Sequence, residues 1–224
     1  MAAWAAIETW PSLTDLSLLE VEPEMIAAGR QLLPAGRWIA GDVSAARGPA
    51  ELVLCSYVLG ELPDPTAAAV RLWEQATDTV AFVEPGTPGG YRRVLAARTV
   101  VLERGGHTVA PCPHDLACPL PEDDWCHFAV RLPRSRLHRR AKRVELGFED
   151  EKFSYAVLSR QRVPPAAARI IRQPQLRSGH VNLVLSEPEG IHERTVSRKQ
   201  GATYKEARGA AWGDAIGLPP EPRP

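Results

Sequence analysis

The sequence predicts an α/β fold built on a doubly wound, Rossmann-like sheet. Short apolar runs alternate with helix-patterned segments over residues 1–104, and several of these runs end at an acid or a small polar residue. The 224 residues are 44% hydrophobic and 24% charged, which excludes wholesale disorder. No apolar run approaches the roughly 18 residues of a membrane span, so we expect no membrane partner. The first residues also lack the pattern of a signal peptide, and we expect a reducing, cytoplasmic location.

The expected elements follow one another at short spacing. Apolar residues at helical intervals predict a helix over 22–33, which Pro34 and Gly36 end. Runs such as LSLLEV and ELVLCSYVL are typical of buried parallel strands. Together these patterns predict helices over 4–10, 22–33, 65–78 and 91–103, and strands over 16–21, 38–42, 51–59 and 79–84. Strand-like runs return later in the chain, over 153–158, 168–171 and 180–185.

Three of the predicted strands end in an acid or a small polar residue, and Glu20 and Asp42 are two of these acids. In Rossmann-like methyltransferases the ligand lies outside the carboxyl ends of the strands. In that case Glu20 would accept hydrogen bonds from the ribose hydroxyls of S-adenosylmethionine, and Asp42 would face its adenine. The alternative is that both acids are solvated turn residues.

Three cysteines, Cys112, Cys118 and Cys126, lie within fifteen residues that are rich in proline and acids and show no regular period. An odd local count of cysteines in a reducing compartment argues against disulfides, and the spacing is not that of a zinc ribbon. Thiolates in irregular, proline-flanked chain favour an iron–sulfur cluster. Two alternatives stay open, a zinc site completed by His114 or His127 and three reduced core cysteines.

The net charge is zero, but residues 1–90 carry four basic and twelve acidic side chains, so the rest of the chain is net positive. Much of the excess lies in one basic run without an acid: Arg131, Arg134, Arg136, Arg139, Arg140, Lys142 and Arg143. Such a run repels itself unless an anion lies against it. It is therefore either a solvated surface or a strip that contacts nucleic-acid phosphates, and we expect the strip. Further arginines would extend this strip: Arg160, Arg169, Arg172 and Arg177.

Six stretches resemble the methyltransferase-like proteins of the mitochondrial small ribosomal subunit and their bacterial relatives. They are LVLCSYVLGEL (52–62), VEPGTPGGYR (83–92), APCPHDLACPL (110–120), DWCHF (124–128), FEDEKFSYAVLSR (148–160) and RSGHVNLVL (177–185). The resemblance covers nearly the whole chain from Trp4 onward. It implies a class I methyltransferase fold, a [4Fe-4S] cluster held by the three cysteines, and association with small-subunit ribosomal RNA or a pre-ribosomal particle. It does not establish catalysis, and we name no catalytic residue.

Two features depart from the family pattern. The family takes its fourth cluster ligand from the strand after the GHV stretch, where this chain has Ser186. A serine oxygen is a poor substitute for thiolate on iron, so the fourth ligand is in doubt.

The second departure concerns the opening strand and its glycine-rich loop, which the family places just before the helix that matches residues 2–10. We expect this strand to be missing, which leaves unpaired sheet edges at 16–21 and 51–59. S-adenosylmethionine is then expected only if the loop exists upstream of Met1. Without the loop, the chain is expected to be inactive as a methyltransferase.

The expected organisation is a partial Rossmann-like methyltransferase domain over 1–104 and a cysteine-rich metal or cluster insert over 105–130. A basic strip and a β-rich C-terminal region that completes the sheet follow over 131–218, and a disordered tail over 219–224. The expected function is that of a small ribosomal subunit assembly factor or a methyltransferase of ribosomal RNA. The alternative is a zinc-stabilised, non-catalytic RNA-binding module.

Overall fold

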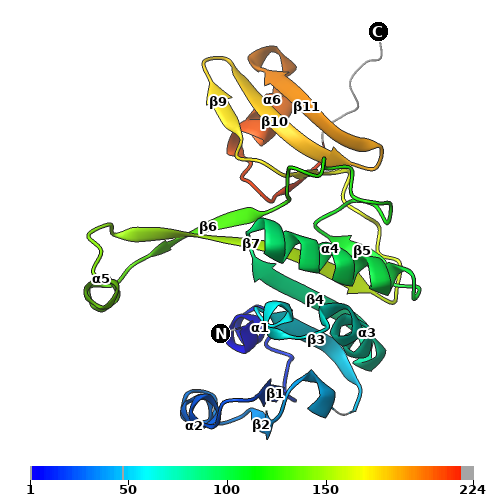
Figure 1. The fold of residues 1–224 in the computed structure, drawn as a ribbon. Helices are drawn as coiled ribbons and strands as arrows, with labels where there is room; N and C mark the ends of the chain where they lie inside the picture. Colours follow the sequence, from blue (N-terminus) through cyan, green and yellow to red (C-terminus); the bar gives the residue numbers. More distant parts are fainter. Residues whose placement is uncertain (1, 47, 218–224) are drawn as a thin grey trace.

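The computed structural model describes residues 2–46 and 48–217, so the tail expected over 219–224 lies outside the described residues. The strands form three sheets, and the largest lies in the middle of the molecule (Figure 1). Its strand order is β3-β4-β7-β5, with β6 paired to β7. These strands are β3 (Ala50–Ser56), β4 (Ala76–Pro85), β5 (His107–Ala110), β6 (Phe128–Pro133) and β7 (Phe148–Ser159).

In this main sheet β3 runs parallel to β4, whereas β7 runs antiparallel to β4, β5 and β6. Helices α3 (Pro65–Gln75) and α4 (Pro88–Leu102) pack on it, and their apolar faces bury Trp73 and Val101 against Phe82 and Leu158. Side chains cap both helices, because Asp64 accepts from Ala67 N and Thr87 accepts from Gly90 N. Each helix also has proline in its first turn, where the missing N–H costs nothing.

A separate two-stranded sheet lies on the N-terminal side. It pairs β1 (Ser17–Glu20) in parallel with β2 (Arg37–Ala40), and the nearby helices are α1 (Ala2–Thr9) and α2 (Pro23–Leu32). Over residues 2–46 and 48–217, β1 pairs only with β2 and β3 pairs only with β4, so each keeps one unpaired edge. The predicted α/β, Rossmann-like class I methyltransferase architecture is confirmed, with its sheet divided between β1 and β3.

The C-terminal region forms the third sheet, in the order β11-β10-β8-β12 with β9 paired to β10. Its core includes Val181, Leu183 and Leu185 of β10, which pack against Tyr204 of the last helix. The elements are β8 (Ala168–Ile170), β9 (Gln175–Arg177), β10 (His180–Glu187), β11 (Gly190–Ser197), α6 (Ala202–Gly209) and β12 (Ala215–Ile216). Three short 3-10 turns complete the described chain: η1 (Val43–Ala45), η2 (Leu59–Glu61) and η3 (Arg198–Gln200).

The strands β6 and β7 extend beyond the main sheet as a two-stranded arm, and helix α5 (Arg136–Lys142) lies at its tip (Figure 1). Ser135 caps this helix by accepting from His138 N, and Arg143 ends it in a left-handed conformation. The basic run therefore folds as the tip of an arm. No helix within the described part of the chain is long and apolar enough to cross a bilayer.

Candidate functional site

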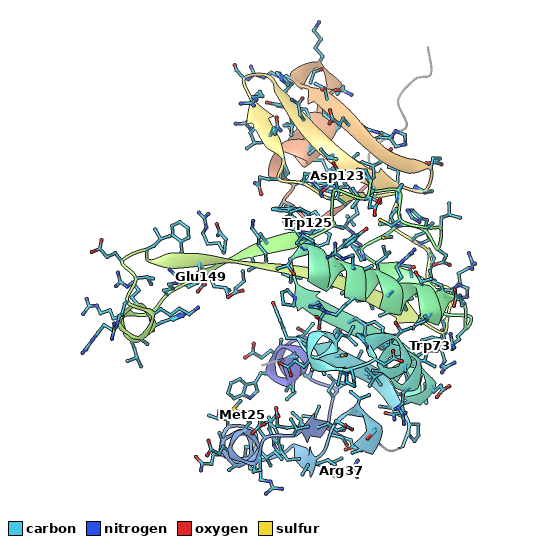
Figure 2. The ribbon with its side chains drawn as sticks, viewed as in Figure 1. Met25, Arg37, Trp73, Asp123, Trp125 and Glu149 are labelled. Atoms are coloured by element: carbon cyan, nitrogen blue, oxygen red, sulfur yellow. The ribbon has the colours of Figure 1, made fainter. Side chains whose placement is uncertain are left out.

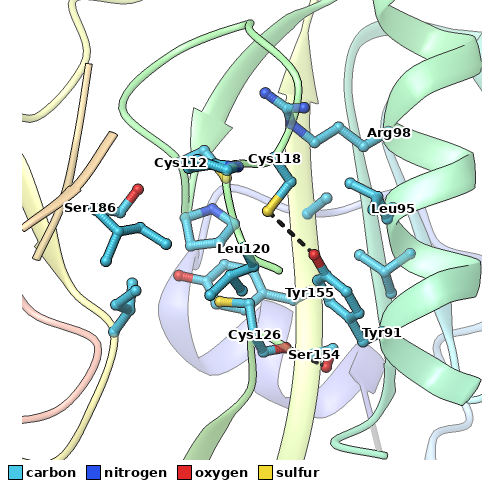
Figure 3. A pocket seen from close by; sticks show the side chains of 16 residues that line it. Tyr91, Leu95, Arg98, Cys112, Cys118, Leu120, Cys126, Ser154, Tyr155 and Ser186 are labelled. Atoms are coloured by element: carbon cyan, nitrogen blue, oxygen red, sulfur yellow. Dashed lines mark hydrogen bonds between the residues drawn. The ribbon is translucent and has the colours of Figure 1, made fainter. Parts of the chain in front are cut away.

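One cavity between α4, the irregular segment 111–127, β7 and the C-terminal sheet gathers four of the predicted site residues. Cys112, Cys118, Cys126 and Ser186 all line it, and its empty volume is about 570 Å³ with solvent-facing space included (Figure 3). The three cysteines come from the irregular segment, whereas Ser186 comes from β10 and is only 6% exposed. No disulfide joins the four cysteines of the chain.

Hydrogen bonds hold the first half of the cysteine segment in place. Two nitrogens of the Arg98 guanidinium on α4 donate to backbone carbonyls, at 3.0 Å to Leu116 O and 2.6 Å to His114 O. The carboxylate of Asp115 accepts from Thr108 N at 2.7 Å, and its second oxygen lies 3.1 Å from Nδ1 of His107. A loop without regular structure is thereby anchored to both α4 and β5.

The second half of the segment links the main sheet to the C-terminal region. Trp125 donates from Nε1 to Gly86 O at 3.0 Å, and the Ser154 hydroxyl donates to Cys126 O at 2.7 Å. Asp124 forms an ion pair with Arg172. Figure 2 shows Trp125 where the main sheet meets the C-terminal sheet. Contacts to the main sheet and to the C-terminal region therefore hold the chain around Cys126 in place.

Burial dominates the electrostatics of the cavity. It raises the pKa of Cys126, and the nearby thiols Cys112 and Cys118 raise that pKa further. Burial also raises the pKa of Cys112, while the charge of Arg98 lowers it. The Tyr91 hydroxyl donates to Cys118 Sγ at 3.1 Å, and burial raises the pKa of this tyrosine as well. A thiolate in this cavity therefore needs a cationic centre to stabilise it.

The two histidines proposed as zinc ligands do not line this cavity. His127 stacks on Trp125 with ring centroids 5.4 Å apart and meets Trp212 edge-on at 5.1 Å. His114 contributes its backbone carbonyl to Arg98. Among the residues that the structure describes, no group of three His, Cys, Asp or Glu side chains is arranged around a single metal ion.

The expected cofactor acids both hydrogen-bond to their own turns. Glu20 accepts from Val21 N at 2.8 Å and from Glu22 N at 3.0 Å. Asp42 caps η1 by accepting from Ser44 N at 2.7 Å, and the Ser44 hydroxyl bond lowers the pKa of this carboxyl. The two acids end neighbouring parallel strands, because Glu20 pairs with Ala40. Both acids lie at one edge of the small sheet, and their carboxylates accept hydrogen bonds from backbone N–H groups of the residues that follow them.

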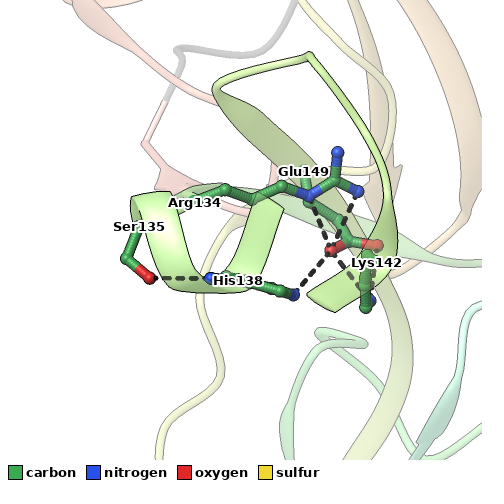
Figure 4. Close-up of polar contacts among 5 residues, drawn as sticks. All are labelled: Arg134, Ser135, His138, Lys142 and Glu149. Carbon is green, nitrogen blue, oxygen red and sulfur yellow. Dashed lines mark hydrogen bonds and ion pairs between the residues drawn. The ribbon is translucent and has the colours of Figure 1, made fainter. Parts of the chain in front are cut away.

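The arm divides the basic run into two groups. One group is paired with acids of β7: the side chains of Arg134 and Lys142 lie 3.0 and 3.1 Å from Glu149 (Figure 4), and Arg131 forms two hydrogen bonds to Asp150, at 2.7 and 2.8 Å. The other group lines an open pocket at α5 together with Val144 and Glu145, and it consists of Arg136, Arg139, Arg140 and Arg143.

Three arginines expected to extend the strip make contacts within the fold. Arg160 donates to the carbonyls of Ala76 and Trp73 and stacks 4.2 Å over the Trp73 ring. Arg169 donates to two backbone carbonyls, and Arg172 pairs with Asp124. The contribution of these three arginines to an RNA-binding strip stays a prediction.

Sequence reasoning missed Tyr91 and Arg98, which lie on α4 and precede the three cysteines in the chain. Their spacing of seven residues puts both on one helix face, and this is the only signal that the sequence offers for them. Cys55, the fourth cysteine, lies in the core of the main sheet, and burial raises its pKa to about 12.

Comparison with known proteins identifies the family to which the chain belongs. Residues 1–217 match the family described as mitochondrial small ribosomal subunit Rsm22. The human mitochondrial ribosome assembly protein METTL17 is 30% identical over 243 aligned residues, which cover 95% of this chain and 52% of that protein. Rsm22-cox11 tandem protein 2 of Schizosaccharomyces pombe is 28% identical over 189 residues, which cover 62% of this chain and 24% of that protein.

The chain thus spans about half the length of the human relative and about a quarter of that of the yeast relative. Both relatives are named as mitochondrial proteins, so the expectation of a cytoplasmic location is wrong. Among solved structures, magnesium protoporphyrin IX methyltransferase from Synechocystis PCC 6803 with bound S-adenosylmethionine is similar at a TM-score of 0.40 and 11% identity. That similarity covers 66% of this chain and 60% of the enzyme chain.

Proposed function

Because the chain belongs to the Rsm22 family of the mitochondrial small ribosomal subunit, we propose that it is an assembly factor of a small ribosomal subunit that binds ribosomal RNA through helix α5. The human relative is named as a ribosome assembly protein, and this name supports the process. The observation that carries the RNA contact is the open pocket at the arm tip, lined by four arginines.

Phosphate is the anion that such a pocket suits best. A guanidinium group presents several fixed N–H donors that match phosphate oxygens, and it stays charged at every physiological pH. The acids Glu149 and Asp150 pair with Arg131, Arg134 and Lys142, whereas Glu145 is the acid that lines the pocket. The arm also holds helix α5, whose arginines line this pocket, away from the main sheet, where a folded RNA can reach it (Figure 1).

RNA binding at this pocket is tested with a double variant. In Arg139→Gln/Arg140→Gln, affinity for a transcript of small-subunit ribosomal RNA should fall, and the slope of log affinity against log salt should become shallower by about 1–2. The control Arg104→Gln/Arg162→Gln removes the same charge from exposed arginines outside the arm and should bind like the unmodified protein. Equal salt slopes for the two double variants would contradict the proposal.

We further propose that the cysteine cavity holds an iron–sulfur cluster through Cys112, Cys118 and Cys126, with Ser186 at the fourth position. The donor set supports this assignment, since three thiols that form no disulfide and a buried hydroxyl line one cavity. Arg98, Arg169 and Arg172 surround the thiols with positive charge that suits an anionic group. A cluster with several irons binds each cysteine at a different iron, so its ligands need not surround one ion.

A cluster bound here would supply covalent metal–ligand bonds that connect separate segments of the chain. Its three thiol ligands would come from the segment 111–127, which contacts α4 through Arg98 and the C-terminal region through Asp124, and its fourth ligand, Ser186, would come from β10 of the C-terminal sheet. The proposed role is therefore to fix the C-terminal sheet against the main sheet.

A further inference from the structure

The cavity wall contains a buried cation, Arg98, that forms no ion pair within the described residues. Its side chain is buried, with the residue 3% exposed, and Arg98 reaches from α4 toward the cysteine segment (Figure 3), where its charge acts on the Cys112 thiol. Two of its nitrogens donate to carbonyls, whereas Nε is buried and has no hydrogen-bond partner among these residues. Burying an unpaired charge and an unsatisfied donor is costly, so this arrangement indicates that an anion belongs in the cavity.

The two carbonyls that Arg98 contacts belong to His114 and Leu116, which lie between Cys112 and Cys118 in the chain. One side chain therefore reaches both the backbone of the loop and the space that its thiols share. Contacts to backbone carbonyls do not need a bound group, so they fix the loop in the metal-free protein as well. The free Nε and the positive charge become useful only when an anionic group is present.

We propose that Arg98 is the positioning residue of the cysteine cavity: it orders the loop between Cys112 and Cys118 before a cluster binds, and its charge then offsets that of the thiolate-bound cluster. The inference deepens the proposed function and rests on it for the second role. The first role stands on the geometry of the loop alone. An arginine with a structural role alone would order the loop but leave the midpoint potential of a bound cluster unchanged.

Two readouts on the full chain separate these roles. In the metal-free protein, hydrogen exchange of the amides of 112–118 reports loop order. In protein reconstituted anaerobically with ferrous iron and sulfide, the midpoint potential reports the charge beside the cluster. The variants are Arg98→Gln, which removes the charge, and Arg98→Lys, which keeps it but loses the fork of donors. Arg104→Gln, just beyond the C-terminal end of α4, is the control, since Arg104 is exposed and its side chain contacts Val100 O and Glu103 rather than the cysteine segment.

For Arg98→Gln we expect exchange at least tenfold faster than in the unmodified protein and a midpoint potential lowered by about 59 mV, a tenfold change for one electron. The potential falls because reduction adds negative charge that the arginine no longer offsets. Arg98→Lys should exchange faster but keep the potential. Unchanged exchange overturns the loop role, and an unchanged potential in Arg98→Gln overturns the charge role.

If Arg98→Gln fails to fold, the exchange of Arg98→Lys decides the loop role, and a rate equal to that of the control overturns it. If the unmodified protein takes up no iron, the cluster proposal and the charge role of Arg98 fail together. The exchange of the metal-free variants still decides the loop role, so the two failures are distinguishable.

Discussion

The hydroxyl of Tyr91 donates a hydrogen bond to Sγ of Cys118 across 3.1 Å. Seven residues further along the same face of α4, Arg98 donates to the backbone on either side of Asp115. One helix face thus holds the cysteine segment at two points, one on a thiol and one on the loop backbone. Both contacts lie on the wall of the cavity that the three cysteines share.

Loss of the Tyr91 hydroxyl should weaken this attachment. Tyr91→Phe keeps the ring and removes the bond, so we expect the free energy of unfolding to fall by about 0.5–1 kcal/mol, because sulfur is a weak acceptor. Urea denaturation of the metal-free protein measures it. Tyr57→Phe is the matched control, since Tyr57 is 46% exposed. An equal loss in both variants would speak against a role for the bond.

A thiol at the fourth position should improve iron binding. In Ser186→Cys the proposed cluster would gain a thiolate, which binds iron better than a hydroxyl does. We expect its visible absorbance to decay several times more slowly in air than in the unmodified protein. The control Ser56→Cys adds a thiol to β3, away from the cavity, and should leave the decay unchanged. Equal decay in all three proteins would exclude Ser186 from the fourth position.

Glu149 should hold the arm tip in a pH-dependent way. Hydrogen bonds from Lys142 and Arg134 lower the pKa of its carboxyl from 4.5. A lowered folded pKa means that the stabilisation is complete above pH 4.5 and is lost as the pH falls through the folded value. Glu149→Gln should therefore speed amide exchange in α5 up to about fivefold at pH 7, the range of an exposed ion pair. The effect should vanish in strong acid, and a difference that persists there would contradict the ion-pair explanation.

The ion pair between buried Glu84 and partly exposed Arg93 should matter for the whole main sheet. Glu84 is 1% exposed and accepts from Leu59 N at 3.0 Å and from Arg93 Nε at 2.9 Å. Glu84→Ala leaves a donor and a cation without a partner, so we expect the free energy of unfolding to fall by about 2–4 kcal/mol. Urea denaturation measures this loss. The control is Glu103→Ala, which removes an exposed carboxylate and should lower the free energy of unfolding by less than about 1 kcal/mol.

Much of the fold follows from local sequence patterns. The predicted strand over 79–84 lies within β4, and the run over 16–21 contains β1, because continuous apolar runs mark buried strands. The predicted helices over 65–78 and 91–103 correspond to α3 and α4, although Pro88 starts α4 three residues earlier than expected. Thr87, the N-cap before that proline, was the missed signal.

Tertiary pairing explains what sequence reasoning missed. In the basic run, Arg131 sits on a strand only because β7 pairs with it through Asp150, nineteen residues away. Ser135 does provide a local helix cap, but the basic run was interpreted as a phosphate-binding strip and no helix was predicted for it. The contribution of α4 to the cysteine cavity likewise depends on how the loop folds back, and no local pattern encodes this contact.

Iron and acid-labile sulfide analysis of the full chain purified without oxygen tests the central claim most directly. We expect brown protein with about four irons and four sulfides per chain for a [4Fe-4S] cluster, and loss of both in the variant Cys112→Ser/Cys118→Ser/Cys126→Ser. The variant Cys55→Ser, which changes a thiol outside the cavity, should keep its iron. Stoichiometric zinc without iron, or iron retained after the triple substitution, would contradict the account.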